Sequence, residues 1–296
     1  MSRNVSRAER IYHVFGVPLR TGSLYPGNEN DAQAYRAVQI ISRLQASGCQ
    51  VKDEGDIALP SYLPHHDVPP IKNWPGPRIA WDCVSQSITP FLQQRGHVPL
   101  LIGCDCSIVV GTTQALMGVA GRDVHILYVD GHGDSFPPQP DKCFSAATVG
   151  LWLITHASAF WAGPPIDPSQ VTVLGWHDHN APPAEEEGVR SFPLTLVRQK
   201  GPREIARQAL QAIPDSASIL LHFDIDVLNK GEMPAAYFPS PEGLNMAEAQ
   251  ELLSTILADS RIAVIEVSEY AALRDFEQTY VSSIVDLLAT GLRTKE

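Results

Sequence analysis

Two apolar segments, each followed by an acidic motif, constrain the fold of this chain more than any other feature. Residues 124–129 (VHILYV) and 219–223 (ILLHF) are nearly continuous in apolar side chains. Such segments are typical of the central strands of a parallel sheet, because helices cover both faces of that sheet. The first segment runs into Asp130 with the sequence DGHGD, and the second runs into Asp224 with the sequence DID. Polar chemistry is therefore expected where two buried strands end.

The spacing within the two motifs gathers potential metal ligands. Alternate residues of an extended segment point the same way, so Asp130, His132 and Asp134 are expected to share one side. Asp224 and Asp226 are expected to do the same. Crowded carboxylates repel one another and raise one another's pKa, and a bound cation is the usual resolution. The pattern predicts a site for two divalent ions.

A second interpretation of these motifs needs no metal. An Asp-x-His-x-Asp sequence also fits the cap of a following helix, because aspartate accepts hydrogen bonds from free backbone N–H groups. The DID sequence likewise fits an ordinary turn at the end of a strand. Both motifs follow apolar strands, however, and this shared placement favours the metal site.

Length and composition bound the class of protein. A chain of 296 residues with 44% hydrophobic content can bury a large core. No boundary between domains is visible, so residues 1–296 are predicted to fold as one domain. The net charge of −11, with only 22 lysines and arginines, argues against a nucleic-acid or anionic-membrane partner and suits a cationic substrate.

Cysteine usage and the amino terminus indicate a compartment. The five cysteines do not form a disulfide framework, and the first ten residues lack the apolar core of a signal peptide. No apolar run approaches the roughly 20 residues needed to span a bilayer. A cytoplasmic protein is expected.

Strand and helix patterns alternate along the rest of the chain. Strands are predicted at 11–17, 98–102, 124–129, 171–175, 219–223 and 262–267, and helices at 31–46, 79–95, 107–117, 146–154, 202–212, 245–257 and 275–292. Such alternation predicts parallel strands joined by right-handed crossovers, hence an α/β fold with helix layers on both faces of a mostly parallel sheet. A proline-rich segment at 59–77 is predicted to be a long ordered loop.

A third strand end completes an ordered set of motifs. The apolar residues 99–102 run into the turn Gly103-Cys-Asp-Cys106-Ser107, which opens a predicted helix. The three motifs in this order resemble those of the ureohydrolases, the arginase and agmatinase family. That family carries a Gly-Gly-Asp-His-Ser turn, an Asp-Ala-His-x-Asp motif and an Asp-x-Asp-x-Leu-Asp-Pro motif. The resemblance covers roughly residues 96–270 and implies a single-domain α/β hydrolase of amidine C–N bonds.

The resemblance implies a role for each acidic motif. Asp130 and Asp224 would bridge two Mn²⁺ ions. His132 and Asp226 would complete one site, and Asp134 would complete the other. A bridging hydroxide would attack the guanidinium carbon, and Asp134 would pass its proton to the departing amine.

Cys106 departs from the pattern of the family, because it stands where the turn carries a ligand histidine. As a thiolate ligand it would weaken the preference for Mn²⁺ against Zn²⁺ or Fe²⁺. As a structural residue it would be a small buried hydrophobe. His125 and His222 lie inside predicted strands and are expected to be core histidines.

The resemblance also implies contacts to the substrate. Glu266, in the sequence VIEV, would hold the guanidinium group. Ser145 falls where arginases place a proton-shuttle histidine. Asp178 and Asn180 fall on two acids that contact the α-amino group of the substrate. Tyr237 replaces part of a Gly-Thr pair, and it fits core packing and a substrate contact equally.

Four features together resemble a small subgroup that hydrolyses N-omega-hydroxy-L-arginine to ornithine and hydroxyurea. They are the turn cysteine Cys106, the DGHGD sequence, the sequence Met-Pro-Ala-Ala-Tyr that ends at Tyr237, and the spacing of Glu266 and Glu269. Ser145, in place of the shuttle histidine, motivates the same choice of substrate. The hydroxyl group makes a hydroxyguanidine less basic than a guanidine, which lessens the need for a shuttle histidine. An arginase or agmatinase that releases urea is the first alternative. A catalytically impaired homologue with a scaffold or regulatory role is the second. A homotrimer or homohexamer is expected from the family.

Overall fold

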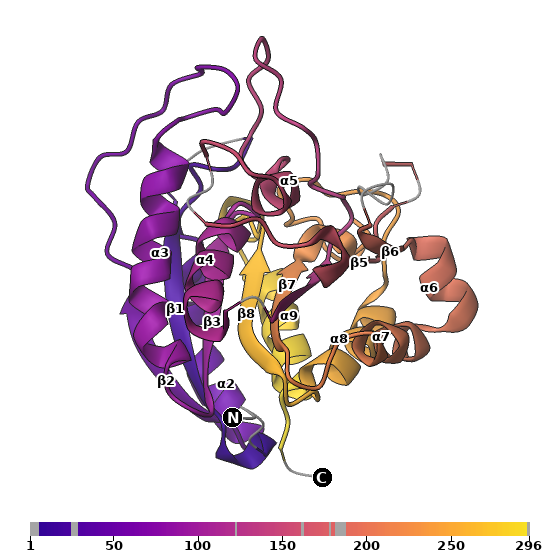
Figure 1. The fold of residues 1–296 in the computed structure, drawn as a ribbon. Coiled ribbons are helices and arrows are strands. Elements are labelled where there is room, and N and C mark those ends of the chain that lie inside the picture. The colour runs from indigo at the N-terminus through magenta and orange to yellow at the C-terminus, as the bar shows by residue number, and fades with distance from the viewer. Residues whose placement is uncertain are drawn as a thin grey trace.

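An eight-stranded sheet forms the centre of the described structure. The structure is a computed structural model, and it describes residues 6–24, 29–121, 123–160, 163–177, 179–180 and 188–294. The strands are β1 (Ile11–Leu19), β2 (Gln50–Asp56), β3 (His97–Cys104), β4 (Val124–Val129), β5 (Val171–Leu174), β6 (Arg190–Phe192), β7 (Ser218–Asp224) and β8 (Ile262–Ser268). Their order is β2-β1-β3-β8-β7-β4-β5-β6, and each neighbouring pair is parallel. Strand β8, from near the end of the chain, therefore lies between β3 and β7 (Figure 1).

Helices cover both faces of this sheet. One layer consists of α1 (Ala32–Ala37), α2 (Ile40–Ala46), α6 (Leu194–Lys200), α7 (Pro202–Gln211), α8 (Met246–Leu257) and α9 (Thr279–Gly291), and the other of α3 (Gly76–Leu92), α4 (Ile108–Ala120) and α5 (Gly150–Thr155). Successive residues of a strand supply the two cores in turn: Leu221 packs in the first core and Leu220 in the second. The predicted three-layer α/β/α fold is confirmed.

The central strands are apolar because both of their faces are covered. Every residue of β7 is buried, and β4 is buried except at His125, which is half-buried. Both strands match the two apolar segments of the sequence within one residue at each end. None of the helices within the described ranges is long and apolar enough to cross a membrane.

Several elements differ from the sequence expectation at their edges. The predicted helix at 31–46 is interrupted at Gln39, whose φ of 60° is left-handed, so α1 and α2 are separate helices. The predicted helix at 146–154 begins only at Gly150. Strands β2 and β6 and helix α6 were not predicted. Strand β2 is largely polar and exposed (QVKDEGD), and β6 and α6 have only three and seven residues.

The proline-rich segment is the predicted ordered loop. It contains no helix or strand before α3 begins at Gly76. Backbone hydrogen bonds fix it at Asn73, whose N–H donates to the carbonyl of His66 at 2.6 Å, and at Lys72, whose N–H donates to the carbonyl of Phe144 at 2.8 Å. These bonds give the loop order outside any regular element.

Candidate metal centre and its pocket

The carboxyl ends of four neighbouring strands define the site. Strands β3, β8, β7 and β4 lie side by side and end at Cys104, Ser268, Asp224 and Val129. The register pairs Asp224 with Ser268 and Phe223 with Val129, so the strand ends are level. The segments that follow these strands therefore surround one hollow at the edge of the sheet.

The loop after β4 holds an imidazole between two carboxylates. Asp130 follows the strand directly, and its Oδ1 accepts the backbone N–H of His132 at 2.6 Å. His132 Nδ1 lies 2.9 Å from Asp226 Oδ2 and 3.5 Å from Asp130 Oδ1. The N–H of Gly131 donates to Asp226 Oδ1 at 3.3 Å, which ties the loop to the end of β7.

Gly131 is required by the close approach of another side chain. A Cβ atom at this position would lie 2.5 Å from Cε1 of His177, which is fully buried. Any larger residue would displace that ring or the loop. The glycine of the DGHGD motif therefore allows Asp130 and His132 to keep their positions.

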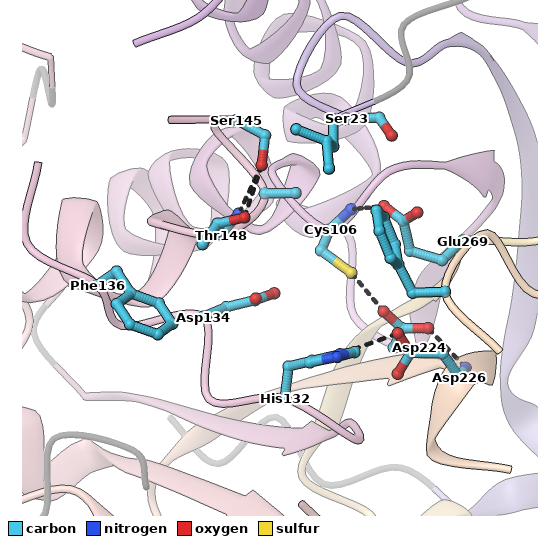
Figure 2. Close-up of a pocket in the computed structure, with 13 residues that line it drawn as sticks. Ser23, Cys106, His132, Asp134, Phe136, Ser145, Thr148, Asp224, Asp226 and Glu269 are labelled. Atoms are coloured by element: carbon cyan, nitrogen blue, oxygen red, sulfur yellow. Dashed lines mark hydrogen bonds and ion pairs between the residues drawn. The ribbon is translucent and has the colours of Figure 1, made fainter. Parts of the chain in front are cut away.

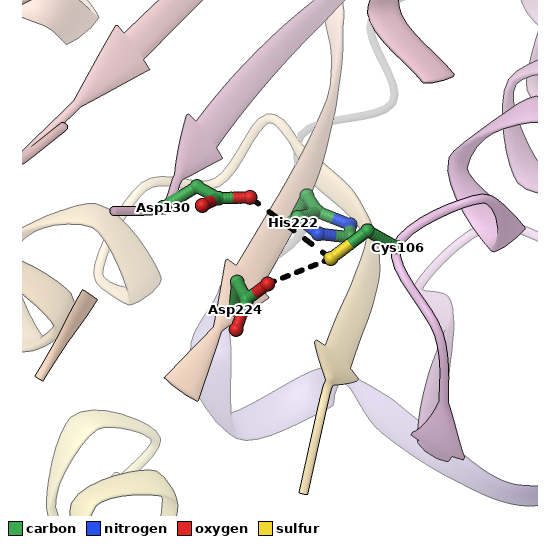
Figure 3. Close-up of side chains that lie close together, drawn as sticks. All are labelled: Cys106, Asp130, His222 and Asp224. Atoms are coloured by element: carbon green, nitrogen blue, oxygen red, sulfur yellow. Dashed lines mark hydrogen bonds between the residues drawn. The ribbon is translucent and has the colours of Figure 1, made fainter. Parts of the chain in front are cut away.

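The turn after β3 brings a thiol into contact with these acids. Cys106 Sγ lies 2.7 Å from Asp224 Oδ2 and 3.9 Å from Asp130 Oδ2 (Figure 3). Asp224 Oδ1 in turn accepts the backbone N–H of Asp226 at 2.7 Å. Cys106 is buried, but its sulfur meets carboxylates. This placement favours the ligand interpretation of Cys106 over simple packing.

Local interactions fix the conformation of that turn. Gly103 has a φ of +76°, and a Cβ atom there would lie 2.4 Å from the backbone nitrogen of Ala32. Asp105 accepts the N–H of Ser107 at 2.9 Å and the N–H of Gly22 at 3.0 Å. The sulfur of the intervening cysteine is consequently held against the end of β7.

Two groups of side chains have ligand atoms close enough to share an ion. Within each group these atoms lie within 4.8 Å of one another: the first comprises Cys106, Asp130, His222 and Asp224, and the second Asp130, His132 and Asp226. Asp130 belongs to both groups, as a bridging carboxylate would. His222 was expected only as a core histidine. The signal for it was its position two residues before Asp224, on the same side of β7.

Asp134 lines the pocket but belongs to neither group. Its backbone has a left-handed φ of 41°, and its Oδ2 accepts the phenol O–H of Tyr128 at 2.8 Å. Tyr128 in turn stacks on the ring of His222, with 4.1 Å between centroids. A fixed aromatic side chain thus orients Asp134, and its predicted role as a ligand stays a prediction.

Burial and mutual repulsion dominate the electrostatics of the cluster. Burial raises the pKa of Asp224 well above its usual range, and the neighbouring charges of Asp226 and Asp130 raise it further. Burial also raises the pKa of the Cys106 thiol, and Asp224 adds to that effect. Burial lowers the pKa of His132, but the carboxylates of Asp226 and Asp130 outweigh it and raise that pKa overall. A divalent cation would relieve this repulsion.

The pocket above the cluster has an acidic floor and a partly apolar wall (Figure 2). The described residues that line it are Ser23, Leu24, Cys106, His132, Asp134, Phe136, Ser145, Ala147, Thr148, Asp224, Asp226, Phe238 and Glu269. None of them is a lysine or arginine. The cavity of about 160 Å³ suits a small molecule, and its charge suits a cationic one.

Glu269, rather than Glu266, reaches this pocket. Glu269 Oε1 accepts the N–H of Cys106 at 3.1 Å, and its buried Oε2 has no hydrogen-bond partner. Glu266 lies two residues inside the end of β8, fully buried, where it accepts hydrogen bonds from Thr112 Oγ1 and from His222 Nδ1. The structure therefore places Glu266 away from the pocket lining. The sequence did not show where β8 ends, and this end decides which of the two glutamates reaches the pocket.

Tyr237 likewise points away from the described lining, which its neighbour Phe238 joins instead. The hydroxyl of Tyr237 donates to Asp31 Oδ2 at 3.2 Å, and the guanidinium carbon of Arg20 lies 3.6 Å from the centre of its ring. This position matches the packing interpretation of Tyr237.

Three further residues were expected to contact the substrate: Ser145, Asn180 and Asp178. Ser145 lines the pocket, and its hydroxyl lies 2.6 Å from Thr148 Oγ1. Asn180 Nδ2 donates to the carbonyl of Gly131 at 2.6 Å, so it supports the metal-ligand loop. Asp178 lies outside the described residues.

Removal of metal is expected to make stability fall as pH rises. The raised pKa values of Asp130, Asp134, Asp224 and Glu269 mean that the folded, metal-free protein binds protons that the unfolded chain has released above about pH 4. Stability is therefore lost as pH increases through the folded pKa values. After chelation, the unfolding temperature should be lower at pH 8 than at pH 6.

Scanning calorimetry at the two pH values, with and without saturating Mn²⁺, checks this expectation. Mn²⁺ should remove most of the difference, because the carboxylates then exchange protons for a cation. A metal-free protein that is equally stable at both pH values would contradict the account of buried, repelling acids.

Comparison with known proteins agrees with this architecture. A family model described as Arginase family matches residues 11–290. An arginase of Brucella melitensis is 23% identical over 295 residues, which cover 94% of this chain and 95% of that protein. An N(omega)-hydroxy-L-arginine amidinohydrolase of Streptomyces lavendulae is 29% identical over 207 residues, which cover 65% of this chain and 68% of that protein.

A solved structure shows the same fold. The crystal structure of arginase from Bacillus subtilis superimposes with a TM-score of 0.82 at 21% identity, over 97% of this chain and 99% of that one. The family match extends over nearly the whole chain and includes every element that surrounds the acidic cluster. The resemblance of the three motifs is thereby confirmed: the chain belongs to the arginase family, whose members are metal-dependent hydrolases acting on the C–N bonds of amidines.

Proposed function

We propose that this protein hydrolyses the C–N bond of a small guanidino or N-hydroxyguanidino compound, with N-omega-hydroxy-L-arginine as the leading substrate. Water and that substrate would give ornithine and hydroxyurea. The observation that carries the proposal is the unpaired Oε2 of Glu269. It lies in a pocket whose described lining contains no lysine or arginine, beside a cluster of thiol, imidazole and carboxylates. A guanidinium group supplies N–H donors for this unpaired carboxylate oxygen.

Two divalent ions would be held by the two groups that share Asp130. Mn²⁺ is the expected metal of the family, and the Cys106 sulfur favours Zn²⁺ or Fe²⁺ in its own group. When bound, such ions supply Lewis acidity and a water-derived nucleophile at neutral pH. The orphaned oxygen of Glu269 and the raised pKa values of the buried acids both support the fit.

The protein side chains bind the substrate and move its protons. Glu269 would accept hydrogen bonds from the guanidino nitrogens and orient the carbon toward the floor. Asp134 would hold a proton on its carboxylate and deliver it to the leaving amine, with Tyr128 fixing its orientation through the 2.8 Å hydrogen bond. Phe136 and Phe238 in the wall would exclude water from the reacting group.

Ser145 is the reason to prefer a hydroxyguanidine. By the resemblance it falls where arginases place the shuttle histidine. It lines the pocket, and its hydroxyl is engaged with Thr148. A serine does not exchange protons near neutral pH as an imidazole does. A less basic substrate needs less help with proton transfer, and the similarity to an N(omega)-hydroxy-L-arginine amidinohydrolase supports the same choice.

A second candidate function is hydrolysis of L-arginine or agmatine with release of urea. The match to arginase over 94% of this chain favours it, and the acidic floor would bind either head group. An impaired homologue is disfavoured because the buried acids are all retained and are unfavourable to hold together without a cation. A homotrimer or homohexamer and a cytoplasmic location are our further proposals from the resemblance and the composition.

The substrate preference is expected to be at least about tenfold. kcat/KM for N-omega-hydroxy-L-arginine should exceed that for L-arginine by this factor, which corresponds to roughly 1.4 kcal/mol of differential transition-state stabilisation. Steady-state assays with product identification test it, with agmatine, guanidinobutyrate and formiminoglutamate in the same panel. Ser145→His should narrow the ratio by restoring an imidazole. A wild-type preference for arginine or agmatine would sink the hydroxyarginine proposal and leave the amidinohydrolase assignment intact.

A further inference from the structure

We propose that His222 is a metal ligand, and that its Nε2 supplies the imidazole which the turn after β3 lacks because it carries Cys106. The ion in this group would then meet one sulfur, one nitrogen and two carboxylates. The inference rests on the proposed function, which requires an ion at this edge of the sheet. The inference adds a ligand that lies inside a strand. It also gives the two sites ligand sets of different chemical softness.

The geometry of β7 directs His222 into the cluster. His222 and Asp224 are alternate residues of one strand and so point to the same side. A ligand atom of His222 lies within 4.8 Å of those of Cys106, Asp130 and Asp224 (Figure 3). This upper limit is close to the widest separation of two ligand atoms on one ion, since metal–nitrogen and metal–sulfur bonds are about 2.0 to 2.3 Å long.

The other ring nitrogen is held as in known metal sites. His222 Nδ1 lies 2.6 Å from Glu266 Oε2, and Glu266 also accepts a hydrogen bond from Thr112 Oγ1. A carboxylate can only accept, so Nδ1 donates and the lone pair of the neutral ring is on Nε2. Metal-binding histidines usually donate their second ring N–H to such a carboxylate, which fixes their orientation.

Packing fixes the plane of this ring. Tyr128 stacks on His222 with 4.1 Å between ring centroids and an angle of 4° between the rings. Ser268 Oγ lies 3.1 Å from Nε2 and 3.3 Å from Cys106 Sγ, between the two proposed ligand atoms. The proposal requires this small hydroxyl to rotate off the line from Nε2 to the ion. The unpartnered Glu269 Oε2, in the pocket that Cys106 lines, independently indicates a missing positive charge.

The proposed ligand set separates the two sites by chemistry. Thiolate and imidazole ligands favour Zn²⁺, Co²⁺ or Fe²⁺, whereas the group of Asp130, His132 and Asp226 is richer in hard oxygen ligands that suit Mn²⁺. Glu266 is thus explained as the residue that positions His222. If His222 had only a packing role, the lone pair on its Nε2 would not need to face the cluster.

Cobalt titration tests the proposal directly. Co²⁺ added to the reduced, metal-free protein should give a thiolate-to-cobalt charge-transfer band and intense visible bands of a low-coordinate ion. His222→Asn keeps an amide N–H near Glu266 but removes Nε2, so it should weaken Co²⁺ binding at the sulfur-containing site by at least about 100-fold and weaken the visible bands. Glu266→Gln should cost about 10- to 100-fold in affinity.

His13 offers a matched control. It is buried on β1, and its Nδ1 lies 2.7 Å from a glutamate carboxylate, Glu54 Oε1, as His222 Nδ1 does from Glu266. His13→Asn should leave the cobalt spectrum and affinity unchanged. If His222→Asn does not fold, X-ray absorption of Zn²⁺-loaded His132→Asn serves instead. Its sulfur-bound zinc should still show imidazole scattering, which then comes from His222.

The outcomes separate the two hypotheses. If wild type binds two ions and His222→Asn retains the spectrum and affinity of wild type, His222 is not a ligand and the proposed function stands. Absence of imidazole scattering in the sulfur-containing site leads to the same conclusion. If wild type binds no Co²⁺, Zn²⁺ or Mn²⁺, the proposed function fails and the ligand proposal fails with it.

Discussion

Asp130→Asn is expected to abolish the binding of both metal ions and to reduce kcat/KM by at least about 10³-fold, roughly 4 kcal/mol. Asp130 is the one side chain common to both candidate ligand groups among the described residues. Its Oδ1 faces His132, and its Oδ2 faces Cys106. Loss of one carboxylate charge therefore weakens both groups together. Elemental analysis after Mn²⁺ loading, beside steady-state kinetics, measures the two effects.

A second buried aspartate provides the control. Asp275 is buried and accepts hydrogen bonds from Tyr270, Thr279 and Val281 near the start of α9, away from the pocket lining. Asp275→Asn should lower stability but leave the metal content at two ions per chain. An Asp130→Asn protein that keeps one tightly bound ion and measurable activity would contradict the shared-carboxylate arrangement.

The sequence predicts the fold well where burial imposes a strong pattern. Segments 124–129 and 219–223 are apolar because helices cover both faces of β4 and β7, so their positions agree with the structure within one residue. The break between α1 and α2 depends on one left-handed residue, Gln39, which side-chain periodicity does not register. Short β6 buries few residues and so leaves little trace in the pattern.

The sequence likewise predicts the candidate site only where a local pattern determines it. Motif spacing after β4 and β7 brings Asp130, His132 and Asp226 together, because alternate residues at a strand end share a direction. Contacts between strands carry no such local signal. His222 shares the direction of Asp224 on β7, but its approach to Cys106 depends on tertiary packing. The pocket position of Glu269 depends on where β8 ends.

Glu269→Gln is expected to lower kcat/KM by roughly 100-fold or more while both ions stay bound. The substitution keeps an oxygen that accepts the N–H of Cys106, at 3.1 Å in the wild type, but removes the negative charge from the buried Oε2. Breaking a buried charge pair with a guanidinium group costs about 2 to 5 kcal/mol, and 2.7 kcal/mol corresponds to a factor of about 100. Steady-state kinetics with N-omega-hydroxy-L-arginine, combined with metal analysis of the same samples, measures the effect.

Glu266→Gln separates substrate binding from metal positioning. Glu266 is engaged by Thr112 and His222 and is absent from the described pocket lining. Its substitution should therefore weaken metal affinity but, at saturating metal, leave KM within about threefold of wild type, since no substrate contact is lost. The opposite result, a large rise in KM for Glu266→Gln with Glu269→Gln unaffected, would return the guanidinium contact to Glu266. Only a different arrangement of the residues after β8 in the substrate complex would then reconcile that contact with the burial of Glu266.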